Sequence, residues 1–311
     1  MKINHSLKNS FKTKTVVTIG TFDGVHVGHK KIVKRLIETA KNNDLESVIL
    51  TFFPHPRMVL QKDANIKLLN TLKEKQAILE NLGLDHFIVE KFTPEFSRLT
   101  AEEFVKQLLV EQLNTQKVII GYDHHFGRNR SANIDDLRNF GKDYHFDVEE
   151  ISAQDVNDVS VSSTKIRKAL INGDIETANL FLGYPYMLTG KVIEGKGLGK
   201  QITFPTANLK IEEDYKLIPK QGVYVVKGYY KNEVLFGMMN IGTNPTIEKN
   251  NAQSIEIHFF NFNKSIYNEE IQVDLLHRIR DERKFDSIDQ LKNQLIIDKK
   301  TAESYLKPNE H

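Results

Sequence analysis

The sequence contains no cysteine, and this absence removes several classes of chemistry. Disulfide bonds, thiolate zinc sites and a cysteine nucleophile are all excluded. Long apolar runs are missing too, because no segment approaches the roughly 20 residues that a membrane-spanning helix needs. The first residues also lack the apolar core of a signal peptide. We therefore expect a cytoplasmic protein without a membrane partner.

A net charge of either sign is also nearly absent. The 43 basic and 41 acidic side chains leave a formal charge of +2, which provides no broad electrostatic surface for nucleic acid. The remaining composition, 40% hydrophobic and 27% charged, is that of an ordinary globular protein. Because 311 residues exceed the usual size of a single core, we expect two domains, and no nucleic acid as a partner.

Short apolar runs alternate with helical patterns over the first half of the chain. Strands are predicted at 16–20, 47–53, 86–90, 117–121 and 146–151, and helices near 29–43, 71–82, 101–113 and 133–142. Strands that alternate with helices favour right-handed crossovers and a parallel sheet covered on both faces. The predicted class is therefore α/β, with ligands expected beyond the carboxyl ends of the strands.

The character of the sequence changes near Tyr184-Pro185, where we place the boundary between domains 1–184 and 185–311. A helical segment at 162–170 and a short helix that ends at Gly183 precede this point. Beyond it, strands are predicted at 186–193, 222–230, 233–241, 254–262 and 269–279. Many short antiparallel strands favour a small closed β-barrel, because closure removes exposed edges.

A final helix is predicted to begin after Ser287, which starts a capping box. The apolar stripe of this helix contains Ile288, Leu291 and Leu295. We expect this stripe to pack on the barrel.

The stretch Gly20–His29 is a candidate phosphate-binding site. It follows a predicted buried strand and leads into a helix, where unpaired backbone N–H groups suit an anion. His26 and His29 lie three residues apart and can donate further hydrogen bonds to phosphate. A polar loop with two surface histidines is the ordinary alternative, and the spacing differs from that of helical metalloprotease motifs. The candidate nucleotide-binding residues in the turn are Gly20, Phe22, Asp23 and Gly24.

Further residues of the first half could complete a nucleotide site. Ser163, Thr164 and Arg167 would provide hydroxyls, helix-start amides and a bidentate guanidinium, unless they form only a helix cap. Asp123 would accept hydrogen bonds from a ribose or help to hold a metal, unless it only forms a turn. A stiff apolar wall for a planar ligand, or simply core and turn positions, is provided by Phe52, Phe53, Pro54 and Pro56.

The second half carries candidates for anion and metal binding. The glycine-rich loop could fold N–H groups and lysine charge around an anion with Gly195, Lys196, Gly197 and Lys200. Thr206 and Asn208 point the same way in an extended segment and would offer two neutral oxygens to Mg²⁺. Turn formation is the alternative in both places.

Glu256 is the most diagnostic single residue of the chain. It alternates with Ile255 and Ile257, so it lies on the other face of a strand from them. This face is either solvated or lines a ligand pocket, where the carboxylate could take a proton from an alcohol. Arg280 and Arg283 are either surface charges or anchors for an anionic or planar ligand.

Both halves together resemble the bacterial bifunctional riboflavin kinase/FMN adenylyltransferase (FAD synthetase) family along nearly the whole chain. The first half carries the resemblance in Gly20–His29, Phe52–Pro56, Gly121–Gly127 and Ser162–Arg167. The second half carries it in Gly195–Asn208, Gly222–Tyr224, Asn240–Thr246, Ile255–His258 and Arg280–Phe285. Several of these motifs are loose individually, but their order on one chain makes a highly specific match.

The resemblance implies two ATP-dependent steps. In the barrel, Glu256 would be the base for the 5′-hydroxyl of riboflavin, Thr206 and Asn208 the ligands of Mg²⁺·ATP, and the loop 195–200 the phosphate cover. The first domain would be a Rossmann-like sheet of the nucleotidyltransferase type, joining FMN to AMP with release of pyrophosphate. Charge on the triphosphate would be stabilised there by His26, His29, Ser163 and Arg167.

The resemblance also implies the ligands of the protein. Riboflavin, FMN, FAD and ATP would be its small-molecule partners, with Mg²⁺ as cofactor, and we expect a monomer or a weak homo-oligomer. The isoalloxazine ring would be bordered by Phe53, Pro54, His55 and Pro56. Three positions depart from the family pattern: Thr203 and Asn268 stand where glycine is frequent, and His124 stands where an aromatic residue is frequent.

Two other functional classes remain as alternatives. One is a flavin-binding or regulatory protein without turnover, which the retained Glu256, Thr206 and Asn208 argue against. The other is a nucleotidyltransferase for a different substrate with an RNA-binding β domain. The near-neutral charge and the lack of an aromatic and basic RNA face argue against it.

Overall fold

The computed structural model describes residues 1–4, 10–61, 66–121, 124–152, 161–195, 204–243 and 253–307. Tertiary contacts divide the chain into two compact units. The α/β unit contains residues 1–68 and 72–162, and the barrel unit contains residues 69–71 and 163–311. Among the helices in these ranges, none is both long enough and apolar enough to cross a membrane.

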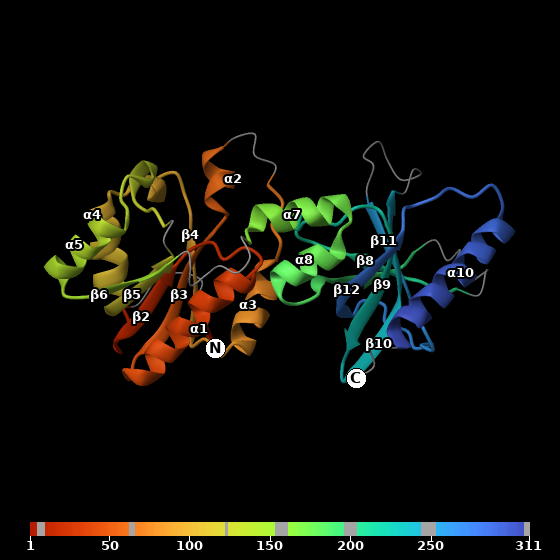
Figure 1. Cartoon of the computed structure of the whole chain (residues 1–311), viewed down its shortest axis with the longest axis horizontal. Coiled ribbons are helices and arrows are strands. Elements are labelled where there is room, and N and C mark those ends of the chain that lie inside the picture. The colour runs from red at the N-terminus through yellow and green to blue at the C-terminus, as the bar shows by residue number, and fades with distance from the viewer. Residues whose placement is uncertain are drawn as a thin grey trace. The chain divides into compact units, whose positions relative to one another are not determined.

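The α/β unit is built on a parallel sheet (Figure 1). Its strands are β1 (Lys2–Asn4), β2 (Thr15–Ile19), β3 (Glu46–Phe53), β4 (His86–Lys91), β5 (Thr115–Gly121) and β6 (Asp147–Ile151). They pair in the order β1-β4-β3-β2-β5-β6, and every pair is parallel. The five predicted strands are confirmed, whereas the edge strand β1 was missed because three residues carry no readable periodicity.

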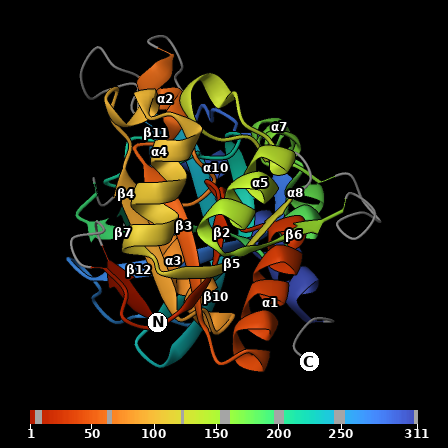
Figure 2. The same ribbon diagram turned by 90° about the vertical axis from the view of Figure 1, so that its left-hand side faces the viewer.

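Helices cover both faces of this sheet, as Figure 2 shows for α1 and α4. The helical segments are α1 (Val27–Asn42), α2 (Pro56–Leu60), α3 (Leu72–Asn81), η1 (Phe96–Arg98), α4 (Ala101–Phe104), η2 (Val105–Gln112), η3 (Arg128–Arg130) and α5 (Ile134–Tyr144). The predicted helix 101–113 begins at the capping box of Thr100 and Glu103 and continues as the π-helical η2. α2 was missed because its five residues are too few for a helical period.

Successive residues of each strand enter different cores, because side chains of a strand alternate between its two faces. One core joins the sheet to α1 and α3 and contains Val16, Leu36, Ile49, Leu79 and Phe87. The other joins it to α4, η2 and α5 and contains Val17, Leu50, Leu109, Val118 and Leu137. The sheet is therefore buried on both faces, as the near-continuous apolar strands predict.

The order of the strands reverses at β2, which lies between β3 and β5. The chain runs outward from β2 through β3 to β4, and then crosses to β5 and β6 on the other side. Ligands of open α/β sheets bind where the order reverses, outside the carboxyl ends of the strands. The loops that follow β2 and β5 are therefore the expected binding loops.

The barrel unit contains a closed barrel, formed in the described part of the chain by six strands. These are β7 (Tyr186–Ile193), β8 (Ala207–Lys210), β9 (Gly222–Tyr230), β10 (Glu233–Thr243), β11 (Gln253–Phe259) and β12 (Glu270–Arg280). They close in the order β10-β11-β8-β7-β12-β9, with antiparallel pairs throughout. The predicted barrel is confirmed, and the short β8 was read only as an extended segment.

Two helices that precede the barrel in sequence pack on it. They are α7 (Ser163–Asn172) and α8 (Ile175–Leu182), and α8 lies against β12 and β7. The Asn179 side chain donates to the Leu275 carbonyl at 2.9 Å and accepts from the Tyr186 N–H at 2.7 Å. Residues 72–162 therefore belong by their contacts to the α/β unit, and the residues from 163 onward belong to the barrel unit. The boundary at 184 stays a prediction about where each activity's domain ends.

The C-terminal helix α10 (Ile288–Leu306) lies along the outside of the barrel (Figure 1). Leu291 and Leu295 pack there as predicted, against a cluster that includes Val223 and Met238. The prediction for Ile288 is wrong, because this residue opens the first turn of the helix and is 56% exposed.

A buried ion pair fixes α10 on the barrel. Asp298 on the helix is 1% exposed and receives hydrogen bonds from Arg280 of β12, at 2.9 Å from Nε and 2.7 Å from Nη2. Gln294 donates to the same carboxylate at 2.9 Å. A carboxylate removed from water needs all of these donors, so the position of α10 depends on this cluster.

Asp298→Ala should therefore destabilise the barrel unit strongly. The change leaves the Arg280 guanidinium without its carboxylate, and breaking such a pair costs about 3–5 kcal/mol. Thermal unfolding monitored by calorimetry would show the loss as a lower transition temperature of the barrel unit. Asp289→Ala, at an exposed position of the same helix, is the matched control and should have little effect. Equal transitions for the two variants would contradict the role of this ion pair.

Candidate active sites

A strained turn connects β2 to α1 in the α/β unit. Phe22 and Val25 have positive φ angles of 44° and 35°, and Gly24 between them has 87°. A branched residue such as Val25 rarely adopts this conformation, which costs about 1–3 kcal/mol. The turn closes through a hydrogen bond from the Val25 N–H to the Phe22 carbonyl at 3.2 Å. It delivers His26 to the N-cap position of α1.

The two predicted histidines stack on each other at the start of α1. Their ring centroids are 3.7 Å apart with an interplanar angle of 17°, and Phe22 lies 5.0 Å from the His29 ring. His26 Nδ1 accepts a hydrogen bond from the His29 backbone N–H at 3.4 Å. This nitrogen therefore carries no proton in the neutral ring, and Nε2 is the donor.

Burial keeps both imidazoles uncharged. It lowers the pKa of His26 to about 4, although Asp23 opposes the shift. Burial also lowers the pKa of His29 well below its ordinary value, and His26 and Lys75 lower it further. Near neutral pH the pair therefore offers neutral N–H donors, and the charge of the site comes from other groups.

Lys75 on α3 is a buried cation beneath the same turn. It is 4% exposed, and its ammonium donates to the Thr21 carbonyl at 2.6 Å. Burial lowers the pKa of Lys75 to about 8, while the nearby Asp23 opposes this shift. The residue was not predicted as part of a site, because no motif surrounds it. The available signal was a lysine in the apolar stripe with Leu72 and Leu79.

A cavity of about 620 Å³ opens beside this turn. Its walls come from the segments that follow β2, β3 and β5, and they include Gly20, Phe22, His29, Phe52, Pro56, Arg57, His124 and His125. Segments that follow three strands thus line one cavity beyond the carboxyl ends of the strands, where ligands were expected. Within the described residues, His29 Nδ1 is buried without a hydrogen-bond partner. Such an atom is satisfied most readily by a ligand or a water.

The predicted flavin wall is only partly in this cavity. Pro56 lines it, whereas Phe53 packs into the core beside α1 and α3. His55 caps α2 by accepting from the Arg57 N–H at 3.2 Å. The aromatic lining comes from Phe52, which was predicted as part of the apolar wall, and from Phe96, which was not, and their rings lie 5.5 Å apart. Alternation along β3 could have shown that Phe52 and Phe53 face opposite ways.

Several predicted residues lie outside this cavity or outside the described ranges. Ser163, Thr164 and Arg167 occupy the first turns of α7, which the contacts group with the barrel unit. The residues that lie outside the described ranges are Asp123, Lys196, Gly197, Lys200 and Thr203. The roles predicted for all of these residues stay predictions.

A group of polar residues around Glu256, the Glu256 group, lies on the outer face of the barrel. Ile255, Ile257 and Phe259 are buried in alternation with Glu256, so the predicted register of β11 is confirmed. Glu256 lies opposite Asn208 of β8 on one side and opposite Asn240 of β10 on the other.

Thr206 and Gly195 complete this polar group. The Thr206 hydroxyl donates to the Glu256 carboxylate at 3.4 Å. Gly195 approaches Asn208 so closely that an added Cβ would lie 2.7 Å from the amide carbon and would overlap the amide nitrogen. The three predicted residues Thr206, Asn208 and Glu256 are thus brought together, and Asn240 was not predicted.

The structure also shows the surroundings of two residues that depart from the family pattern and of the two predicted arginines. Asn268 has φ +65°, the left-handed region that asparagine tolerates better than most residues, so it can replace glycine there. His124 lies in the wall of the α/β cavity. Arg280 is engaged by Asp298, whereas Arg283 is exposed. A flavin-binding role for either arginine stays a prediction.

Comparisons with known families agree with this division of the chain. The family model described as FAD synthetase matches residues 8–165. The family model described as riboflavin kinase matches residues 182–306. The first range contains the histidine turn and its cavity, and the second contains the barrel with the Glu256 group.

Relatives cover almost the whole chain. The bifunctional riboflavin kinase/FMN adenylyltransferase of Buchnera aphidicola subsp. Schizaphis graminum is 37% identical over 304 residues, covering 97% of this chain and 96% of its own. That of Bacillus subtilis is 39% identical over 308 residues, covering 97% and 95%. A crystal structure named as a macrolide-efflux protein from Streptococcus pneumoniae superposes with a TM-score of 0.87 at 29% identity, covering 97% of this chain and 98% of that one. The superposition establishes a shared fold over nearly full length.

The fold and the two polar sites define a transferase with an α/β domain and a kinase-type barrel. The chain belongs to the bifunctional riboflavin kinase/FMN adenylyltransferase family. It is therefore an ATP-using enzyme that phosphorylates riboflavin to FMN and adenylylates FMN to FAD.

Gly195→Ala should impair the kinase activity selectively. The added methyl group displaces the Asn208 amide, and a misplacement of about 1 Å in such a site costs up to about 100-fold in rate. Initial rates of FMN formation from riboflavin and of FAD formation from supplied FMN would separate the two steps. The second rate should equal that of the unmodified enzyme. An unchanged first rate would show that the contact between Gly195 and Asn208 does not matter for catalysis.

Proposed function

We propose that the barrel unit performs the kinase step and that the α/β unit performs the adenylyl transfer. The observation that supports this division is that two different sets of polar side chains are grouped, one in each unit. A carboxylate with neutral oxygen donors gathers on the barrel, and neutral imidazoles gather at a helix start beside the cavity of the α/β unit. The first arrangement suits transfer to an alcohol, and the second suits transfer to a phosphate that is already anionic.

In the proposed kinase step, Glu256 orients the 5′-hydroxyl of riboflavin and accepts its proton. The hydroxyl oxygen forms a bond to the γ-phosphorus of ATP while the bond from that phosphorus to the bridging oxygen breaks, and ADP leaves. Thr206 is within hydrogen-bond distance of the same carboxylate, which fixes the direction of the base. The close approach of Gly195 in turn holds the Asn208 amide beside Glu256.

Mg²⁺ fits this group of residues. Thr206, Asn208 and Glu256 present hard oxygen atoms, which are the donors that Mg²⁺ prefers, and few protein ligands are needed because phosphates and waters supply the rest. Thr206 and Asn208 would hold the ion, as the sequence predicts. When bound, it would neutralise charge on the β- and γ-phosphates.

In the proposed adenylyl transfer, a phosphate oxygen of FMN attacks the α-phosphorus of a second ATP. A new bond to that oxygen forms, the bond from the α-phosphorus to the bridging oxygen breaks, and pyrophosphate leaves. The nucleophile carries no proton that must be removed, so no strong base is required. In this proposal His26 Nε2–H, the His29 ring and the start of α1 donate to the developing charge; the N-cap position of His26 and the proton on its Nε2 support this role.

Other groups are proposed to support the adenylyl transfer. Lys75 holds the turn through the Thr21 carbonyl, and its charge adds a positive potential below the imidazoles. Phe52 and Pro56 give the cavity an apolar wall for a planar ring. Ser163 and Arg167 would contact the triphosphate from α7. A cytoplasmic location and a monomeric or weakly self-associating state complete the proposal.

Glu256→Gln tests the kinase half of this proposal. The amide keeps the shape of the side chain but does not accept the proton, so FMN formation should fall about 100- to 10,000-fold. FAD formation from supplied FMN should be unaffected. Chromatographic separation of the flavins measures both rates, and Glu270→Gln, an exposed change elsewhere on the barrel, is the control. Retention of kinase activity by Glu256→Gln would remove this residue from the mechanism.

His29→Ala tests the adenylyl-transfer half of this proposal. Loss of a preorganised donor should lower the rate of FAD formation about 100- to 1,000-fold, and FMN made from riboflavin should accumulate. His145→Asn, an exposed change at the end of α5, serves as the control. If folded His29→Ala enzyme lost both activities, two separate sites would be the wrong description. If it lost neither, the helix start would not be the transfer site.

A further inference from the structure

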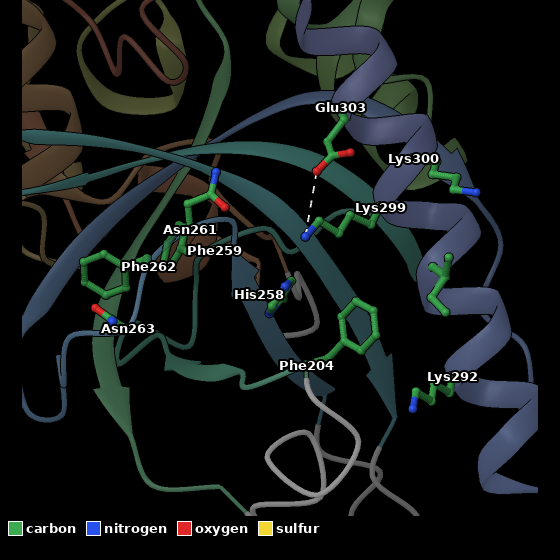
Figure 3. A pocket seen from close by; sticks show the side chains of 11 residues that line it. Phe204, His258, Phe259, Asn261, Phe262, Asn263, Lys292, Lys299, Lys300 and Glu303 are labelled. Carbon is green, nitrogen blue, oxygen red and sulfur yellow. Dashed lines mark ion pairs between the residues drawn. The ribbon is translucent and has the colours of Figure 1, made fainter.

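The barrel unit contains a cavity that the two proposed steps do not use, next to a smaller one that Thr206 lines and with which it shares Phe259, Phe262 and Asn263. The larger cavity has a volume of about 700 Å³ and lies between the outer barrel face and α10 (Figure 3). None of Gly195, Thr206, Asn208 or Glu256 lines it. Small-molecule sites in proteins have volumes of about 300–1,000 Å³, so the space suits a ligand of moderate size.

The barrel side of this cavity is aromatic and carries amides. Phe204 and His258 lie edge to face with ring centroids 5.1 Å apart, and Phe262 extends the wall. Asn261 and Asn263 add side-chain amides at the same side. A wall of ring edges and amides suits a flat heterocyclic ligand, which can stack and form hydrogen bonds at once.

His258 contributes a neutral ring to this wall. Its Nδ1 lies 2.9 Å from the Pro205 carbonyl, which can only accept, so this nitrogen carries the proton. Burial lowers the pKa of His258, the Pro205 carbonyl opposes this shift, and Lys299 lowers the pKa further. The ring therefore adds no positive charge near neutral pH.

The α10 side of the cavity is cationic. Lys292 and Lys299 are two turns apart on one face of the helix, and Figure 3 shows both side chains extending from it toward the barrel. Lys299 has Glu303 at 3.8 Å, a long contact for an ion pair. In the described part of the chain, no carboxylate lies within 4.0 Å of Lys292. The lysine charges therefore exceed the acidic charge of the cavity.

We propose that this cavity is an additional ligand site, for an anion of about mononucleotide size in which an aromatic ring system is joined to a phosphate. The ring would lie against Phe204, His258 and Phe262, and the phosphate would receive hydrogen bonds from Lys292 and Lys299. Because the chain as a whole carries only +2, the charge of this face does not follow from a general excess of lysine.

Pyridoxal 5′-phosphate is a suitable probe, because it joins a flat ring, a phosphate and an aldehyde. Its aldehyde carbon condenses with a lysine amine, water leaves, and borohydride adds hydride to the imine to give a stable secondary amine. Peptide mass spectrometry of the full-length enzyme then measures the labelling of each lysine. We expect Lys292 or Lys299 to be labelled at least about tenfold more than the exposed Lys191 and Lys210. Labelling at the level of these two lysines would overturn the proposal.

Competition identifies which part of a ligand is recognised. FMN and ADP each combine a ring with phosphate, whereas riboflavin lacks phosphate and inorganic phosphate lacks a ring. FMN or ADP should protect the two lysines at concentrations about tenfold lower than riboflavin or inorganic phosphate. Protection by inorganic phosphate at the same concentration would reduce the site to a simple anion site and contradict the proposal. The better competitor of FMN and ADP identifies the ring that is preferred.

A matched pair of variants tests the geometry. Lys292→Gln should lower the labelling of Lys299 about tenfold, because Lys292 holds the phosphate of the probe while the Lys299 amine forms the imine. Lys307→Gln is the control, since Lys307 is an exposed lysine at the C-terminal end of the same helix and does not line the cavity. It should leave the labelling of Lys299 unchanged. An equal effect of the two variants, or no effect of Lys292→Gln, would contradict the proposed site.

Discussion

The α/β unit depends on the burial of two imidazoles at the start of a helix. His26 is buried, His29 is half-buried in the wall of the cavity, and burial lowers the pKa of both rings, so neither is charged near neutral pH. The turn achieves this burial at the cost of positive φ angles at Phe22 and Val25. Strain of this kind persists only where the surroundings hold it, and here Lys75 holds the Thr21 carbonyl.

Neutral donors have a physical advantage at such a site. Preorganised N–H groups can be aimed at the charge that develops in the transition state, without a further buried charge next to Lys75. The positive charge comes instead from Lys75, one layer below. The step proposed for the barrel differs, because its phosphoryl acceptor is an alcohol that must lose a proton. The strand alternation that buries Ile255 and Ile257 places the Glu256 carboxylate on the outer face for that purpose.

The sequence predicts those features that depend on local periodicity. Short apolar runs located the strands of the α/β unit, alternation gave the outward face of Glu256, and a capping box located the start of α10. Family resemblance added the two activities, which composition could not supply. The features that were missed depend on contacts between distant segments. Lys75 and Thr21 are 54 residues apart, and only the fold brings them together. The ion pair of Arg280 was not predicted, because its partner, Asp298, lies 18 residues away on another element.

The most direct test of this account is the protonation state of the two histidines, measured by nitrogen NMR of the free enzyme over a range of pH. We predict neutral rings near neutral pH, with the proton of His26 on Nε2 and protonation of this ring only as the pH falls toward about 4. The pKa of His29 should also lie below its ordinary value. Imidazolium signals from His26 or His29 near neutral pH would contradict the account, because the site would then act through charged rings.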